Sequence, residues 1–183
     1  MGEIKSTLDL VLEKTRHLRL GDEEKREILR EDAKKRARGY ALKYVEGVWR
    51  LSQLLKTLGE EDPDPDVLEE TVRTVVEQLR PGDMNIRLLD DLGEWRGDRA
   101  QDEIDGIRRE LEAFERRERS LSDEIRERVI KELEGKGIYG SAVVPKIQHH
   151  AEWIEKNEQM ILESNRVLEP LRNELVRRLL SGV

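Results

Sequence analysis

The chain of 183 residues has no cysteine and few residues of the other types that often carry chemistry. It contains three histidines, and its aromatic residues are three tryptophans, three tyrosines and one phenylalanine. Without cysteine, the chain itself can form no disulfide, thiolate zinc site, iron–sulfur cluster or cysteine nucleophile. The lack of cysteine is compatible with a reducing cytoplasm, which is the location we expect.

Long apolar runs are missing as well. The sequence has no run of about 18 apolar residues, so we expect no membrane-spanning helix and no membrane partner. Residues 1–20 carry charges throughout and do not resemble a secretory signal peptide.

Charge is what the sequence has in excess. Charged residues make up 41% of the chain and hydrophobic residues 36%, against about 25% and 45–50% in ordinary globular domains. This composition favours elongated helices with a narrow apolar seam and wide solvated faces. The net charge of −7 argues against nucleic acid as the main partner, because affinity for phosphate requires positive charge.

Residues 1–95 are predicted to form an N-terminal helical region. Apolar residues at alternating spacings of three and four indicate a helix over 4–18. A seven-residue repeat, typical of a coiled-coil seam, indicates a second helix over 23–58. The repeat consists of Ala37, Tyr44, Leu51 and Leu58, with Ala41, Val48 and Leu55 four residues after the first three.

An acidic linker with two prolines follows at 59–66. Gly59 is the expected end of the preceding helix, because glycine suits the position just after a helix, and the prolines prevent the helix from continuing. Asp66 is then expected to cap a short helix over 67–80. A short helix or an irregular covering segment is expected over 84–95.

Residues 96–183 are predicted to form a long antiparallel, coiled-coil-like helical hairpin. One helix covers 98–134 and the other 145–181, and a glycine-rich turn at 135–145 joins these equal lengths. The fold class is therefore all-α, with no strands. If the turn is symmetric, residues whose numbers sum to 279 lie level, which pairs Ile104 with Leu175, Leu111 with Leu168, and Ile125 with Ile154.

The middle of this predicted seam is partly polar. The stripe of the second helix reads Ile147, Ala151, Ile154, Glu158, Ile161, Asn165, Leu168, Arg172, Leu175 and Leu179. Glu118 falls on the stripe of the first helix, which either continues through Ser120 and Ser122 or breaks there. A buried polar cluster around Glu118, Glu158 and Asn165 would favour a ligand-binding or metal-binding helical protein or an enzyme.

Two short motifs resemble functional ones. Residues 135–140 match G-x-G-x-x-G, but a charged helix precedes them where a dinucleotide site needs a strand, so we interpret them as a helix end and turn. His149 and His150 are neighbours and point about 100° apart on a helix, so they cannot bind one metal together. We expect no cofactor, no metal site and no enzymatic activity.

The turn of the hairpin is a candidate interaction site. Residues 137–145 contain no charged residue in a chain that is 41% charged. Leaving large apolar side chains exposed there would forgo about 1.5–3 kcal/mol each. We expect the turn to dock on the N-terminal helices or on a second subunit, or else to bind another protein. The candidate residues are Ile138, Tyr139, Val143, Val144 and Pro145.

A basic run within 34–44 is the second candidate site. It is either a face that binds nucleic acid or an acidic partner, or a solvated face that pairs with Glu27, Glu31 and Asp32 at helical spacing. The residues of this basic face are Lys34, Lys35, Arg36, Arg38 and Lys43.

Two stretches resemble a family of uncharacterised bacterial helical proteins. They are Lys5–Leu18, with the sequence KSTLDLVLEKTRHL, and Gly137–Pro145, with the sequence GIYGSAVVP. The resemblance covers about 23 residues of the chain. It implies a bacterial, cytoplasmic setting, and it implies no activity and no site residues.

These observations favour a helical protein–protein interaction or scaffold protein that self-associates as a homodimer and binds an unknown protein partner. Apolar residues beside the seams, such as Trp49, Met160 and Val167, support self-association because a second apolar face needs a second partner. One alternative is a helical protein or enzyme that binds a small ligand or a metal. The other is a nucleic-acid-associated protein that uses the basic face at 34–44.

Overall fold

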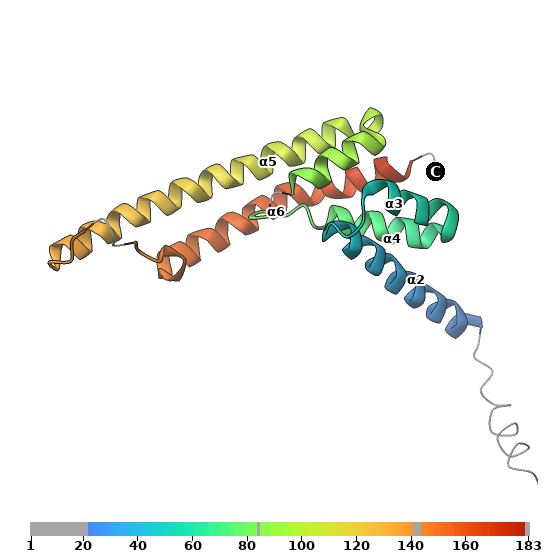
Figure 1. Cartoon of the computed structure of the whole chain (residues 1–183), viewed down its shortest axis with the longest axis horizontal. Helices are drawn as coiled ribbons and strands as arrows, with labels where there is room; N and C mark the ends of the chain where they lie inside the picture. The colour runs from blue at the N-terminus through green and yellow to red at the C-terminus, as the bar shows by residue number, and fades with distance from the viewer. Residues whose placement is uncertain (1–21, 84, 141–143, 182–183) are drawn as a thin grey trace, which may run out of the picture.

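The computed structural model describes residues 22–83, 85–140 and 144–181 (Figure 1). Over these residues the chain folds into helices and connecting turns, with one isolated β-bridge between Arg80 and Asp83 and no strand. The all-α prediction is confirmed for this part of the chain, and the predicted helix 4–18 lies outside it. The elements are α2 (Asp22–Val45), α3 (Leu51–Lys56), the π-helical turn η1 (Thr57–Glu61), α4 (Pro65–Val76), α5 (Ile86–Gly135), the 3-10 turn η2 (Ile147–His149) and α6 (Ala151–Leu180).

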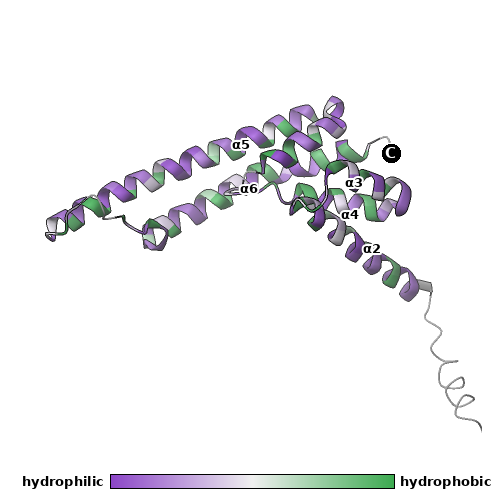
Figure 2. Ribbon diagram, viewed as in Figure 1, coloured by the Kyte–Doolittle hydropathy of each residue, from purple (hydrophilic) through white to green (hydrophobic). Residues whose placement is uncertain are grey.

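The molecule consists of a helical base and a two-helix arm (Figure 1). The base is formed by α2, α3 and α4 with the adjoining parts of α5 and α6. We call residues 118–163, where α5 and α6 extend beyond α2, α3 and α4, the arm (Figure 1). One core of 22 buried residues fills the base and draws on both predicted regions, 1–95 and 96–183. Among the described residues of the arm, three apolar ones are buried, namely Leu121, Ile125 and Ile147. Apolar residues accordingly gather in the base and thin out along the arm (Figure 2).

The prediction of one helix over 23–58 is wrong, because the chain breaks between α2 and α3. Gly47 adopts a φ of +77°, a left-handed conformation that favours glycine. The break turns α3 back on the base, where Leu54 and Leu58 join the core (Figure 1). Val48, predicted on the seam, is instead 67% exposed.

The helix ends around the acidic linker also differ from the prediction. Gly59 lies inside the π-helical turn η1, and α4 is capped by Asp64 rather than by Asp66. The Asp64 carboxylate accepts a hydrogen bond from the Asp66 backbone N–H at 3.0 Å. Pro65 opens the helix, because proline has the helical φ and lacks an N–H that the first helical position does not need.

Helix α5 contains two segments that the sequence predicted separately, 84–95 and 98–134. Arg96 between them is not helical, with φ −145° and ψ 25°, and the chain reverses direction there (Figure 1). Arg108 and Asp90 form an ion pair of 2.7 Å across the bend, although a straight helix would separate them by about 27 Å. Beyond the bend α5 is continuous, without the break considered at the two serines.

Helix α6 runs antiparallel to α5, which confirms the helical hairpin, but it begins at Ala151 rather than at Pro145. In the base the predicted register agrees with the structure, because both members of the pairs Ile104–Leu175 and Leu111–Leu168 lie in the core. Helix α6 also continues through Pro170, as predicted.

In the arm, however, α6 uses a different face from the predicted one. Trp153, Asn157 and Met160 are half-buried and Ser164 is buried, each one residue before a predicted position. Of the predicted positions, Ile154 and Glu158 are exposed, whereas Ile161 and Asn165 are half-buried. Trp153 packs beside Ile125 and donates a hydrogen bond from Nε1 to Ser122 at 3.2 Å. Ile154 is 41% exposed. The predicted Ile125–Ile154 pair is therefore wrong, because the larger tryptophan fills that space.

Helices α5 and α6 approach closely at Gly106, so a substitution there tests this packing. A Cβ at Gly106 would lie 3.3 Å from the Leu171 side chain, whereas nothing lies within 4 Å of a Cβ at Gly39 in α2. Gly106→Leu should lower the free energy of unfolding by about 1–3 kcal/mol because it overpacks the interface. Gly39→Ala should raise it by about 0.5–1 kcal/mol because alanine favours the helix. Urea unfolding measures both, and a Gly106→Leu variant as stable as the wild type would contradict the packing.

Candidate functional site

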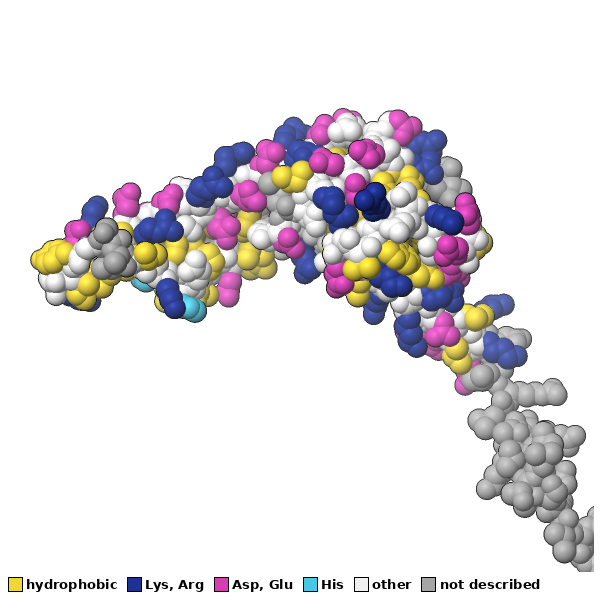
Figure 3. All heavy atoms as spheres, in the orientation of Figure 1, with side chains coloured by type: hydrophobic (Ala, Val, Ile, Leu, Met, Phe, Trp, Pro, Cys, Tyr) yellow, Lys and Arg dark blue, Asp and Glu magenta, His cyan; other side chains and the backbone are white. Residues whose placement is uncertain are grey.

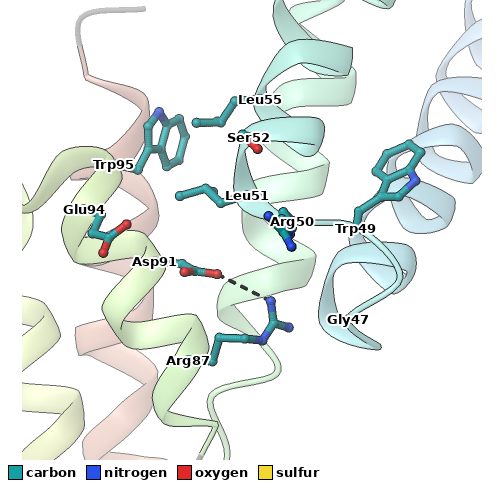
Figure 4. Close-up of a pocket in the computed structure, with 10 residues that line it drawn as sticks. All are labelled: Gly47, Trp49, Arg50, Leu51, Ser52, Leu55, Arg87, Asp91, Glu94 and Trp95. Carbon is teal, nitrogen blue, oxygen red and sulfur yellow. Dashed lines mark hydrogen bonds and ion pairs between the residues drawn. The ribbon is translucent and has the colours of Figure 1, made fainter.

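A groove of about 630 Å³ opens where the α2–α3 break meets the first segment of α5 (Figure 4). Trp49 lines it from the break, and Trp95 lines it from the end of that α5 segment. Leu51 and Leu55 of α3 add aliphatic surface beside Trp95. The fold thus brings together apolar residues that lie far apart in the sequence.

Four charged side chains surround this apolar surface, namely Arg50, Arg87, Asp91 and Glu94 (Figure 4). Arg87 and Asp91 form an ion pair at 3.4 Å, drawn as the dashed line. Among the residues that the structure describes, Arg50 and Glu94 have no ion-pair partner. These two charges are available to a ligand, whereas Arg87 and Asp91 are already engaged.

Arg87 and Asp91 fasten the end of α2 to α5. The Tyr44 hydroxyl donates a hydrogen bond to Asp91 at 2.6 Å. The Arg87 guanidinium donates to the carbonyl oxygens of Tyr44 and Val45 at 2.8 and 3.1 Å, and it lies 4.9 Å from the centre of the Tyr44 ring. The last carbonyls of a helix have no partner inside it. Arg87 therefore supplies a donor to the Val45 carbonyl and a second one to the Tyr44 carbonyl, which also accepts from the Gly47 N–H at 3.0 Å.

The groove is suited to binding a partly apolar ligand such as a peptide segment. Trp49 is held in place by stacking on Tyr40, with ring centroids 5.6 Å apart, and by the Lys43 ammonium 4.5 Å from its ring. Fixed aromatic surface with a few charges at its edge is typical of binding sites. Within the described residues, no three His, Asp or Glu side chains are placed to hold a metal ion.

The basic face is paired with carboxylates of the same chain. Arg36 donates to Asp62 at 2.8 Å and to Asp64 at 3.0 Å, so the acidic linker lies against the basic run. The sequence did not reveal this pairing, because the partners are 26 and 28 residues apart. The other contacts are Lys34 with Glu31, Lys35 with Asp32, Arg38 with Glu70 at 4.0 Å, and Lys43 over the ring of Trp49. The pairs with Glu31 and Asp32 have the predicted helical spacing.

The described residues of the hairpin turn are exposed rather than docked. Ile138, Tyr139 and Val144 are 48%, 73% and 77% exposed, and hydrophobic atoms gather at the end of the arm (Figure 3). Pro145 is half-buried, and Val143 lies outside the described residues. The turn does not dock on the described N-terminal helices of its own chain, because α5 and α6 carry it to the far end of the arm (Figure 1). The predicted helix 4–18 lies outside the described residues. Contact with a second subunit or another protein stays a prediction.

The glycine motif at 135–140 ends helix α5. Lys136 is the C-cap residue, and Gly137 follows with a φ of +79°. The Gly137 N–H donates to the Glu134 carbonyl at 3.0 Å and closes the last turn. The interpretation of this motif as a helix end and turn is therefore confirmed.

The buried polar cluster that would favour a ligand-binding protein, at Glu118, Glu158 and Asn165, does not form. Glu158 is exposed, and Asn165 accepts a hydrogen bond from Arg172 at 2.7 Å. Glu118 and Asn165 are half-buried, so the three side chains share no buried cluster.

A different polar group lies between α5 and α6 instead. Ser164 is fully buried and donates a hydrogen bond to the Glu110 carboxylate. Arg117 pairs with the same carboxylate at 2.8 Å and donates to the Ser164 hydroxyl at 3.1 Å. All polar groups named here have partners, so this layer fixes how the two helices sit together.

Comparison of the chain with protein-family models, with curated proteins and with solved structures found no match. The resemblance to a bacterial family therefore stays a prediction. None of the described helices is long and apolar enough to span a membrane.

Tyr44 provides a pH-dependent test of the contact between α2 and α5. Burial, followed by the hydrogen bond to Asp91, raises the pKa of Tyr44 above its ordinary value. Because the pKa of Tyr44 is higher in the folded state than in the unfolded state, its neutral hydroxyl stabilises the fold at pH values below the unfolded-state pKa of about 10. This contribution to the free energy of unfolding is lost as the pH rises above 10. Tyr44→Phe should lower the free energy of unfolding by about 0.5–1.5 kcal/mol at pH 8 and should weaken its decline above pH 10.

Urea unfolding of both proteins between pH 8 and pH 11.5 measures this difference. Tyr139→Phe at the exposed tip is the matched control and should leave the profile unchanged. Parallel profiles for the wild type and Tyr44→Phe above pH 10 would contradict the assignment.

The pairing of the basic face predicts weak binding to nucleic acid. Because Lys34 and Lys35 already face carboxylates, we expect the wild type to elute from heparin below about 0.15 M salt. The variant with Lys34→Glu and Lys35→Glu should elute at nearly the same salt. Strong retention of the wild type that the variant loses would support the nucleic-acid alternative.

Proposed function

We propose that this chain is a helical interaction protein that self-associates through its arm, most simply as a homodimer. The observation that carries the proposal is the apolar surface of the arm, in the part of the molecule with the smallest core. Five large apolar side chains there are 41–77% exposed, namely Ile138, Tyr139, Val144, Ile154 and Leu162.

Covering these side chains would stabilise an assembly. Full burial of a large apolar side chain contributes about 1.5–3 kcal/mol, so even partial burial of five contributes several kcal/mol. The arm cannot supply this burial itself, because each of two paired helices covers only the face turned to the other. Because none of the described residues covers these side chains, we propose that a second molecule does.

The base provides a separate surface for a protein partner. The groove between Trp49 and Trp95 lies in the base, at the opposite end of the molecule from the tip (Figures 1 and 4). Association through the arms would therefore leave each groove free. We further propose that the protein is a non-enzymatic scaffold with coiled-coil-like arms and that it acts in a bacterial cytoplasm.

Dimerisation should depend on the apolar surface of the arm. Light scattering between 5 and 200 µM should show the mass rising from 21.4 kDa towards twice that value. The variant with Ile154→Glu and Leu162→Glu should stay monomeric, because the charges would have to be desolvated at the contact. Leu29→Glu is the matched control, since Leu29 in α2 is 67% exposed and Leu162 is 61% exposed.

Circular dichroism should show unchanged helix content in both variants. A wild type that stays at 21.4 kDa throughout would contradict the proposal. Equal loss of the dimer in the Leu29→Glu control would place the contact outside the arm.

A further inference from the structure

The tip of the arm carries positive charge and no negative charge. Residues 135–151 contain two lysines and two histidines but no aspartate or glutamate, although the chain has 41 acidic residues. Lys136 and Lys146 are exposed, and neither has an ion-pair partner in the described parts of the chain. The apolar residues that they flank are Ile138, Tyr139 and Val144.

The outer face of α6 in the arm combines apolar and acidic residues. Ile154, Glu158 and Leu162 are four residues apart and lie on one side of the helix, with Glu155 beside them. All four are exposed. As far as the structure describes the chain, Glu155 and Glu158 have no ion-pair partner. Arg166, one turn beyond Leu162, is basic and marks the end of this face.

These two surfaces cannot cover each other within one chain. Helix α6 leads away from the tip, and its pairing with α5 keeps the arm extended (Figure 1). Near the start of α6, Arg128 of α5 pairs with Glu152, and Trp153 donates to Ser122 at 3.2 Å. The tip and the outer face can therefore meet only between two molecules.

We propose that two copies of this chain pair with their arms antiparallel, so that the tip of each copy lies on the outer face of α6 of the other. This inference rests on the proposed self-association and names its interface. Lys136 and Lys146 would face Glu155 and Glu158, and the exposed apolar residues of the two surfaces would cover one another. In this dimer the tip and the outer α6 face of each copy are both occupied by the other copy. No surface is left for a third copy, so the assembly does not extend into a fibre.

The extent of these surfaces sets the expected affinity. A contact between five apolar and four charged side chains of each copy falls at the lower end of specific interfaces, at roughly 600 Å² per partner. We expect a dissociation constant in the micromolar range. Because the charges lie at an exposed edge, the affinity should fall as salt concentration rises.

Charge reversal tests the pairing. The variant with Lys136→Glu and Lys146→Glu has two acidic surfaces, and the variant with Glu155→Lys and Glu158→Lys has two basic ones. Alone, each should dimerise about 10-fold or more weakly than the wild type, because like charges meet at both contacts. An equimolar mixture should associate about as tightly as the wild type, because opposite charges then meet at both contacts. Sedimentation equilibrium measures all three.

One further variant and one control complete the experiment. The chain with all four substitutions should dimerise like the wild type, and Lys56→Glu with Glu60→Lys in the base should have no effect. If the wild type dimerises and either two-site variant dimerises equally well, or if the mixture fails to associate, the antiparallel pairing is overturned while self-association stands. If the wild type stays monomeric, both proposals are overturned.

Discussion

Helices α5 and α6 are longer than the base on which they pack, and this difference in length governs the rest of the structure. In the base they are covered by α2, α3 and α4, and 22 buried residues form the core. In the described part of the arm, α5 and α6 pack on each other and on the short turn η2, and three of its described apolar residues are buried. A helix buries apolar surface only where it has neighbours. The exposed apolar residues of the arm follow from this shortage of helical partners.

Polar contacts replace much of the apolar burial between the arm helices. The Ser164–Glu110–Arg117 group lies where the arm leaves the base, and Arg128 pairs with Glu152 near the start of α6. A hydrogen bond from Lys156, followed by the charge of Arg128, keeps the pKa of Glu152 below its ordinary value. The exposed Arg128–Glu152 pair contributes little free energy, whereas Ser164 is buried and needs its hydrogen bonds. The described part of the arm thus has little apolar burial, which is the basis of the proposed association with a second copy.

The sequence predicted the features that depend on local pattern and missed those that depend on distant partners. The helix over 98–134 and the glycine turn were predicted because an unbroken stripe and left-handed glycines are local signals. The wrong α6 face arose because Trp153 and Ile154 both begin series that reach Leu168 at helical spacing, and only contact with α5 selects between them. The break at Gly47 had one local signal, the glycine itself. The groove and the Arg36–Asp62 pair had none, because their members meet only in the folded chain.

The central claim is that the arm depends on a second copy for its full stability, and amide hydrogen exchange tests it most directly. Exchange is measured at 1 µM and at 200 µM protein. The amides of 121–135 and 151–163 should exchange about 10-fold more slowly at the higher concentration, because local opening would then require dissociation. Those of 104–111 in the base should exchange equally at both. Arm amides that are equally protected at both concentrations would contradict the account.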